Sequence, residues 1–170
     1  MQIGMIGLGR MGAAMVHRLM GAGHDCVVYD PNPEPVAGLA TDGATPAASL
    51  SEFAAALTPR RVVWVMVPAA VVGAVVDELS PLLERGDIVI DGGNSYYRDD
   101  MARAARLAES GIAYLDAGTS GGVFGADRGY CLMVGGDDEA VAHVEPVLAA
   151  LAPGIDAAER TPGRTGEPST

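Results

Sequence analysis

Short, mainly apolar runs alternate along the chain with stretches whose apolar residues recur every three or four positions. The apolar runs lie at residues 2–6, 26–29, 61–67, 86–91, 112–116 and 130–134. A strand that is buried on both faces reads as an unbroken apolar run, whereas an amphipathic helix repeats its apolar positions with a period near 3.6. The pattern therefore predicts a buried strand at each of these runs.

Helical spacing fills the intervals between these strands. It covers 11–20, begins again after a hydroxyl cap at Ser49, and spans 71–83, 99–111 and 137–151, with a break near Pro81 and a kink at Pro146. Strands that alternate with helices are typical of a parallel sheet with right-handed crossovers. We therefore expect an α/β fold, a Rossmann-type doubly wound and mostly parallel sheet with helices on both faces.

A glycine-rich string joins the first predicted strand to the first predicted helix. It reads Gly7, Leu8, Gly9, Arg10, Met11, Gly12. In this context the first glycine permits a tight turn, the second lets the backbone approach a pyrophosphate, and the third lets the helix pack closely on the strand. Such a string alone also occurs in simple tight connections. Its position between a strand and a helix favours a dinucleotide site.

A single acidic residue, Asp30, ends the second predicted strand 18 residues after Gly12, where a carboxylate accepts hydrogen bonds from the ribose hydroxyls of NAD. NADP carries a phosphate on one of these hydroxyls, and two unit charges about 4 Å apart near a protein surface repel by roughly 4 kcal/mol. Pro31, Asn32 and Pro33 follow without an arginine, although one from elsewhere in the fold could still reach the site. The predicted cofactor is therefore NAD.

The composition and the sequence argue against several other classes of function and partner. The chain of 170 residues has 22 acidic and 11 basic residues, a formal charge of −11 that disfavours nucleic acid as a partner. No apolar stretch reaches membrane-spanning length, and the first strand begins at Met1 with no room for a leader, so we expect a cytoplasmic protein without a membrane partner. Cys26 and Cys131 both fall in strand-like runs and read as buried, reduced thiols. We expect no metal.

Further glycine-rich or polar segments follow other predicted strands. They are Val67-Pro68-Ala69-Ala70, Asp91-Gly92-Gly93-Asn94-Ser95 and 118–125. Ligands of open parallel sheets bind outside the carboxyl ends of the strands. Each segment alone can be an ordinary turn, but together with amide and hydroxyl side chains they suit a polyhydroxylated substrate beside a nicotinamide.

The strings IGLGRMG, VPAA, DGGNSYYRDD and GTSGGVFGADRGYCLMVGG together resemble the 6-phosphogluconate dehydrogenases, and the likeness covers nearly the whole chain. The related 3-hydroxyisobutyrate dehydrogenases share the glycine string and a Ser-Gly-Gly turn but generally lack DGGNS. Members that use NADP typically have an Asn-Arg-Thr type segment where this chain has Tyr29-Asp30-Pro31. The resemblance therefore favours the NAD-dependent subgroup.

The resemblance implies roles for particular residues. Gly7 to Gly12 would hold the pyrophosphate, and Val67, Pro68 and Ala69 would line the adenine or nicotinamide side. Asn94 would contact both nicotinamide ribose and substrate, and Ser120, Gly121 and Gly122 would bind the sugar acid. The family oxidises 6-phosphogluconate at C3 and then releases CO2, which gives ribulose 5-phosphate in the pentose phosphate pathway.

The family's lysine and glutamate, which act as base and acid, have no counterpart here, and the sequence contains no lysine. The resemblance places them in a helical domain beyond Thr170, and it assigns the phosphate ligands to that domain and a partner subunit. We therefore expect a dinucleotide-binding domain over 1–156, a linker or disordered tail over 157–170, no catalytic residue in this chain, and a homo-oligomeric full-length enzyme. A 3-hydroxyacid dehydrogenase and a non-enzymatic nucleotide-binding module remain alternatives.

Overall fold

The computed structural model describes residues 1–155, 157, 159, 162–163 and 165. The strands are β1 (Gln2–Ile6), β2 (Asp25–Tyr29), β3 (Thr45–Pro46), β4 (Val62–Val65), β5 (Ile88–Asp91), β6 (Ala113–Ser120) and β7 (Cys131–Gly135). The helices are α1 (Arg10–Gly21), α2 (Pro33–Thr41), α3 (Leu50–Ala56), α4 (Ala69–Leu79), α5 (Tyr97–Ala108), α6 (Gly125–Arg128) and α7 (Asp138–Leu151), with 3-10 turns at Ser80–Leu82 and Gly122–Phe124.

The strands form one seven-stranded sheet in the order β3-β2-β1-β4-β5-β6-β7. Neighbouring strands from β3 to β6 pair in parallel, and β7 pairs antiparallel to β6. After β3 the chain crosses to the other side of β1 to form β4, so the carboxyl ends of β1 and β4 flank a topological switch point. Ligands of doubly wound sheets bind at such a point.

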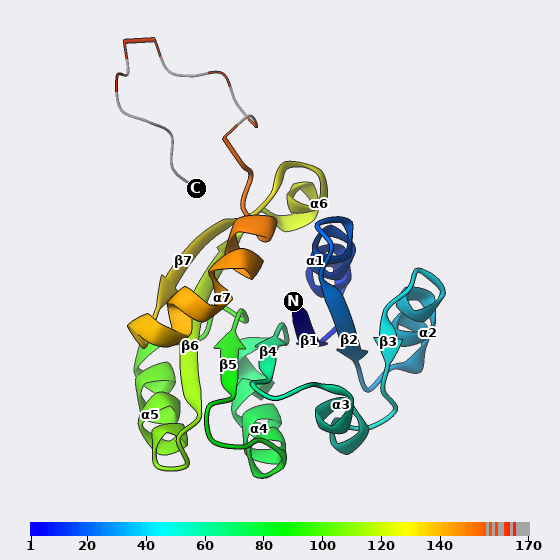
Figure 1. Cartoon of the computed structure of the whole chain (residues 1–170), viewed down its shortest axis with the longest axis vertical. Helices are drawn as coiled ribbons and strands as arrows, with labels where there is room; N and C mark the ends of the chain where they lie inside the picture. Colours follow the sequence, from blue (N-terminus) through cyan, green and yellow to red (C-terminus); the bar gives the residue numbers. More distant parts are fainter. Residues whose placement is uncertain (156, 158, 160–161, 164, 166–170) are drawn as a thin grey trace.

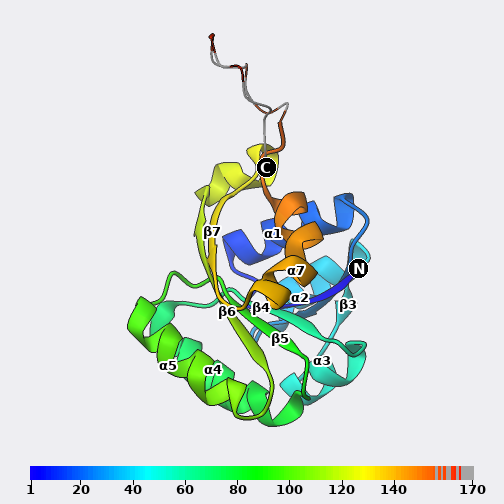
Figure 2. The same cartoon turned by 60° about the vertical axis from the view of Figure 1, so that its left-hand side comes forward.

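Helices cover both faces of the sheet, with α1, α2 and α7 on one face and α3, α4 and α5 on the other (Figures 1 and 2). The core on the first face includes Trp64, and the core on the second includes Phe53; both side chains are fully buried. The predicted α/β, Rossmann-type fold is confirmed.

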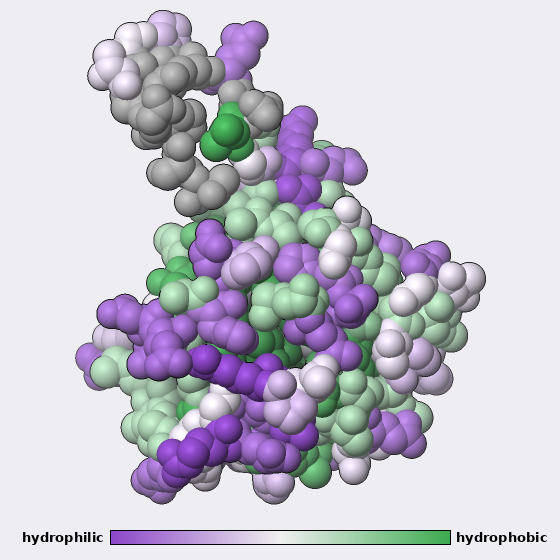
Figure 3. Space-filling model, in the orientation of Figure 1, coloured by the Kyte–Doolittle hydropathy of each residue, from purple (hydrophilic) through white to green (hydrophobic). Residues whose placement is uncertain are grey.

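The surface mixes polar and apolar residues. On the face in Figure 3, hydrophilic residues are interspersed with hydrophobic ones. Within the described ranges, no helix is both long enough and apolar enough to cross a bilayer. The tail predicted over 157–170 lies largely outside the described residues.

Every predicted strand and helix has a counterpart, including the break after α4, where the chain enters a 3-10 turn at Ser80–Leu82. Ser49 caps α3 as expected, since its hydroxyl accepts a hydrogen bond from the Glu52 N–H at 3.1 Å. Helix α2 was not predicted, although Asn32 caps it and Pro33 occupies its first turn. This Asn-Pro pair is a helix-start signal that the proline-rich context obscured.

Two expectations about the last strands were wrong. Gly118, Thr119 and Ser120 were expected in a loop after a strand, but β6 continues to Ser120 because β7 pairs with it antiparallel. Cys131 was expected to be buried and is exposed, whereas Cys26 is buried. Strand β7 lies at the edge of the sheet, so its alternating side chains are not covered on both faces.

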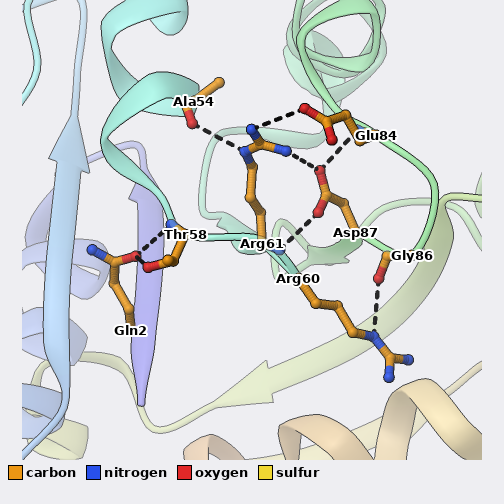
Figure 4. A network of polar contacts seen from close by, with 8 residues as sticks. All are labelled: Gln2, Ala54, Thr58, Arg60, Arg61, Glu84, Gly86 and Asp87. Atoms are coloured by element: carbon orange, nitrogen blue, oxygen red, sulfur yellow. Dashed lines mark hydrogen bonds and ion pairs between the residues drawn. The ribbon is translucent and has the colours of Figure 1, made fainter.

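An ion pair between Arg61 and Asp87 links the segments that precede β4 and β5 (Figure 4). The Asp87 carboxylate accepts hydrogen bonds from the Arg61 N–H at 2.7 Å, the Arg61 guanidinium at 3.0 Å and the Glu84 N–H at 2.8 Å. Burial alone lowers the pKa of Arg61, but the hydrogen bond and charge of Asp87 outweigh it and leave that pKa raised. The pair lies at the sheet end opposite the glycine-rich turns.

Candidate functional site

The glycines of the turn after β1 have three different surroundings. Gly7 has φ +92°, and a Cβ on it would lie 2.5 Å from the Met66 carbonyl oxygen. A Cβ on Gly12 would collide with the carbonyl oxygen of Gly7, because α1 packs directly on the strand end. A Cβ on Gly9 would have no described heavy atom within 4 Å. Two glycines are thus needed for packing, and the third borders open space.

The amino terminus of α1 faces that open space. Gly9 occupies the N-cap position, no side chain caps the helix, and its first turn carries no acidic residue. The N–H groups of a first helical turn have no partner within the helix and carry a partial positive charge, so they bind anions such as phosphate. Arg10 is exposed beside Gly9, whereas Leu8 is buried and Met11 is partly buried.

Asp30 follows β2 and turns its carboxylate toward this loop. Oδ2 accepts a hydrogen bond from the Leu8 N–H at 2.7 Å, and Oδ1 accepts one from the Asn32 N–H at 2.8 Å. The carboxylate is therefore fixed at the rim of the site and partly exposed. Within the described part of the chain, no arginine forms an ion pair with it.

A cavity of about 450 Å³ adjoins Asp30. Tyr29, Pro33, Val36 and Pro46 contribute apolar walls, and Glu52 lies at its edge. An apolar slot next to a carboxylate suits a flat base attached to a diol-bearing sugar. The sequence pattern did not predict this cavity, because part of its wall comes from α2 and β3, which were not predicted.

The ends of β1, β4 and β5 meet around Val67. A Cβ on Gly7 would lie 2.7 Å from Val67 Cγ1, and a Cβ on Gly93 would lie 2.5 Å from the Val67 carbonyl oxygen. Val67 is partly buried, while Pro68 and Ala69 are exposed where α4 begins. The structure thus brings the glycine string, the VPAA segment and the DGGNS segment together at one edge of the sheet.

Asn94 joins the loop after β5 to β6. Its Nδ2 donates to the Thr119 carbonyl at 3.2 Å, and its Oδ1 accepts from the Thr119 N–H at 3.0 Å. Asn94 is also a non-glycine residue at positive φ, +54°. Through these two hydrogen bonds the Asn94 amide pairs with the β6 backbone as a neighbouring strand would, and we call this arrangement the Asn94–Thr119 clasp. The sequence had not identified Thr119 as the partner of Asn94. The remaining amide hydrogen and carbonyl lone pair stay available to a ligand.

The proposed sugar-acid segment lies just beyond this clasp. Ser120 ends β6 and is exposed, and Gly121 and Gly122, also exposed, have φ +154° and +52°. Glycine adopts positive φ without steric cost, so the chain can turn sharply and present backbone groups beside Asn94. Asp91 hydrogen-bonds within its own loop, since it accepts from the Gly93 N–H at 2.8 Å and the Ser95 hydroxyl at 2.7 Å.

The residues present fit a dinucleotide. The open space at Gly9 and the uncapped N–H groups suit a diphosphate. The fixed Asp30 carboxylate suits the ribose that adjoins it. A doubly wound sheet with this loop at its switch point defines the class of NAD(P)-binding oxidoreductase domains.

Comparison with known proteins narrows the class. A sequence profile described as the NAD binding domain of 6-phosphogluconate dehydrogenase matches residues 2–158. The NAD(+)-dependent, decarboxylating 6-phosphogluconate dehydrogenase of Haloferax volcanii is 45% identical over 157 residues, which cover 92% of this chain and 52% of that protein. The chain belongs to the 6-phosphogluconate dehydrogenase family as its NAD-binding domain, and NAD is the cofactor of that domain. It spans about half the length of this relative.

Solved structures agree on the fold. The Plasmodium falciparum 6-phosphogluconate dehydrogenase, solved without ligand, with its cofactor NADP+ and with its substrate, superposes with a TM-score of 0.85 at 27% identity, covering 92% of this chain and 35% of that one. Mycobacterium tuberculosis 3-hydroxyisobutyrate dehydrogenase, solved with L-serine, gives a TM-score of 0.81 at 33% identity, covering 89% of this chain and 52% of that one.

Alanine at Gly9 and at Gly12 should have separable effects. Gly9→Ala should leave the free energy of unfolding within about 1 kcal/mol of wild type, because its Cβ meets open space, yet it should weaken NAD binding by occupying that space. Gly12→Ala should destabilise the fold by about 1–3 kcal/mol, because its Cβ overlaps the Gly7 carbonyl. Urea denaturation and calorimetric titration with NAD measure both. Equal loss of stability in the two variants would contradict this division.

Proposed function

We propose that this chain supplies the cofactor site and part of the substrate site of an NAD-linked 6-phosphogluconate dehydrogenase, which converts 6-phosphogluconate to ribulose 5-phosphate and CO2 in the pentose phosphate pathway. The observation that carries the proposal is the Asn94–Thr119 clasp. It joins the DGGNS segment to the GTSGG segment next to the glycine string, so cofactor-binding and sugar-binding elements form one continuous rim.

In this proposal each loop binds a different part of the ligands. The N–H groups of α1 and Gly7 to Gly12 bind the pyrophosphate, and Asp30 binds the adenosine ribose. Val67, Pro68 and Ala69 line the nucleotide, and Asn94 reaches the nicotinamide ribose and the substrate. Ser120, Gly121 and Gly122 bind the sugar acid. When bound, NAD supplies a hydride acceptor; this chain's residues bind and orient the reacting molecules.

Asp30 supports NAD over NADP. Its carboxylate is held by two backbone N–H groups and is balanced by no arginine in the described region. A ribose phosphate placed there would bring like charges together, whereas two ribose hydroxyls would donate hydrogen bonds to the carboxylate. The 45% identity to an NAD(+)-dependent relative supports the same choice.

The groups that move protons in the reaction lie outside this chain in our proposal, so the chain alone binds NAD without turnover. The net charge of −11 agrees with phosphate ligands supplied from elsewhere. We propose that the whole enzyme is a homo-oligomer in which neighbouring parts complete the pocket. Its location is the cytoplasm, since both cysteines are free thiols.

A 3-hydroxyacid dehydrogenase is the second candidate. The 33% identity and TM-score of 0.81 to the M. tuberculosis 3-hydroxyisobutyrate dehydrogenase favour it. That activity would use the same glycine string and Ser120 turn. The DGGNS segment distinguishes the two, because the resemblance links that string to the phosphogluconate branch.

Ligand titration tests the proposal. The chain saturated with NAD is titrated with 6-phosphogluconate or 3-hydroxyisobutyrate while amide NMR signals of Asn94, Ser120 and Gly121 are followed. We expect 6-phosphogluconate to shift all three signals and 3-hydroxyisobutyrate to shift them less at equal concentration. The reverse order would establish the second candidate, and absence of NAD binding would reject both. NADH formation by the chain alone would contradict the placement of its proton-transfer groups.

A further inference from the structure

A buried group of polar side chains lies behind Asn94 and has no part in the roles assigned above. The Tyr114 hydroxyl is 2.9 Å from Asp91 Oδ2 and 3.1 Å from Asp100 Oδ1. Arg103 donates to the same Asp100 oxygen at 2.9 Å and lies 3.7 Å from Asp91 Oδ2. Asp91 and Asp100 are 0% and 4% exposed. Such burial of two acids requires specific compensation.

The hydrogens in this group can be counted. A tyrosine hydroxyl has one hydrogen and can donate it to one carboxylate. The contacts on both sides of Tyr114 are hydrogen bonds only if one acid supplies a second hydrogen. Charge gives the same answer, because within the described ranges Arg103 alone is paired with these acids, so it balances one buried carboxylate and leaves the other without a countercharge.

The second hydrogen belongs to Asp100. Asp91 already accepts from the Gly93 N–H and the Ser95 hydroxyl, and these donors stabilise its ionised form. Asp100 Oδ2, in contrast, is buried and has no described hydrogen-bond partner. Burial, followed by the hydrogen bond and charge of Asp91, raises the pKa of Asp100 to about 6.

The other groups around this cluster do not supply a hydrogen in place of the proton on Asp100. Asp116 on β6 lines a small cavity together with Asp100 and Tyr114. Burial together with the charge of Asp91 raises the pKa of Asp116. Tyr97 from α5 also lines that cavity. On α4, Asp77 forms an ion pair with Arg106 of α5, so it is neutralised apart from the cluster. Of these neighbours, Asp116 adds negative charge and favours the protonated form of Asp100.

The cluster is coupled to Asn94 through the turn that carries it. Asp91 bonds to Gly93 and Ser95, the residues on either side of Asn94, which itself has positive φ. We propose that Asp100, Tyr114 and Asp91 share a proton and act as positioning residues that fix the Gly92–Ser95 turn and present Asn94 to the bound nucleotide. This inference rests on the proposed role of Asn94 in the NAD site.

Two isosteric substitutions test the asymmetry between the acids. Asp100→Asn imitates the protonated acid, and we expect its dissociation constant for NAD to stay within about twofold of wild type at pH 5.5. Asp91→Asn replaces the carboxylate that accepts from the Gly93 N–H and the Ser95 hydroxyl with an amide, which carries donors of its own. We expect NAD binding to weaken about fivefold or more. Equal effects of the two substitutions would overturn the assignment of the proton.

Two tyrosines provide a matched pair. Tyr114→Phe removes the shared hydroxyl and should shift the Asn94 side-chain amide signals and weaken NAD binding by about fivefold. Tyr130 is also buried, but its hydroxyl has no described partner, so Tyr130→Phe should leave both readouts unchanged. Unchanged Asn94 signals in Tyr114→Phe would reject the coupling.

The pH dependence separates positioning from simple packing. Because the pKa of Asp100 is raised on folding, the stability that this group contributes is full at low pH and is lost as pH rises toward about 6. In wild type the Asn94 signals should change with a midpoint near pH 6, and Asp100→Asn should remove that change. A change that persists in Asp100→Asn would reject the proposal. If wild type fails to bind NAD, the proposed function fails, while the Asn94 signals still decide the positioning role.

Discussion

Asp30→Ala is expected to lose most of the preference for NAD over NADP. NAD should bind at least about tenfold more weakly, because a carboxylate that accepts from ribose hydroxyls contributes about 1.5–3 kcal/mol. NADP should bind about tenfold more tightly, because even a third of the roughly 4 kcal/mol repulsion from its phosphate is relieved. Calorimetric titration with both cofactors measures the ratio of their dissociation constants.

Two further variants isolate the cause. Asp30→Asn keeps an oxygen that can accept from the Leu8 N–H but removes the charge, so it should gain affinity for NADP with a smaller loss for NAD. Asp25 begins β2 at the opposite edge of the sheet, and Asp25→Ala makes the same change in net charge. It should leave the ratio unchanged. An unaltered ratio in Asp30→Ala, or an equal shift in Asp25→Ala, would remove Asp30 from its proposed role.

Asp87→Ala should cause the largest loss of stability. The Asp87 side chain is 2% exposed and the Arg61 side chain 11%, so the substitution leaves a largely buried guanidinium without its buried acidic partner. Breaking a buried pair from one side costs about 3–5 kcal/mol. Unfolding in urea should therefore show a midpoint well below that of wild type.

Glu84→Ala is the matched control, because Glu84 contacts the same guanidinium at 3.3 Å but is 68% exposed. Its loss should be below about 1 kcal/mol, as for most surface ion pairs. NAD affinity of the folded protein should be unaffected in both variants, since Asp87 directly precedes β5 and so lies at the strand end opposite the glycine-rich turns. A loss for Asp87→Ala no larger than that for Glu84→Ala would contradict this account.

The cofactor side of the site was readable because its signals are local. Gly7, Gly9 and Gly12 lie within one strand–turn–helix unit, and Asp30 ends the next strand. Alternation of apolar runs with helical spacing likewise indicates the fold class without knowledge of any long-range contact. The short elements α2 and β3 were not predicted, because prolines and a glycine interrupt α2 and β3 has only two residues, one of them a proline.

The sequence by itself determined the doubly wound fold, the dinucleotide string and the acid that follows it, because each depends on residues close together in the chain. Only the tertiary structure decided that β7 runs antiparallel and extends β6, that Asn94 clasps Thr119, and that Tyr114 stands between two buried acids. These features join residues that are distant in sequence. Their burial and hydrogen bonding exist only after the sheet has assembled, so no local pattern encodes them.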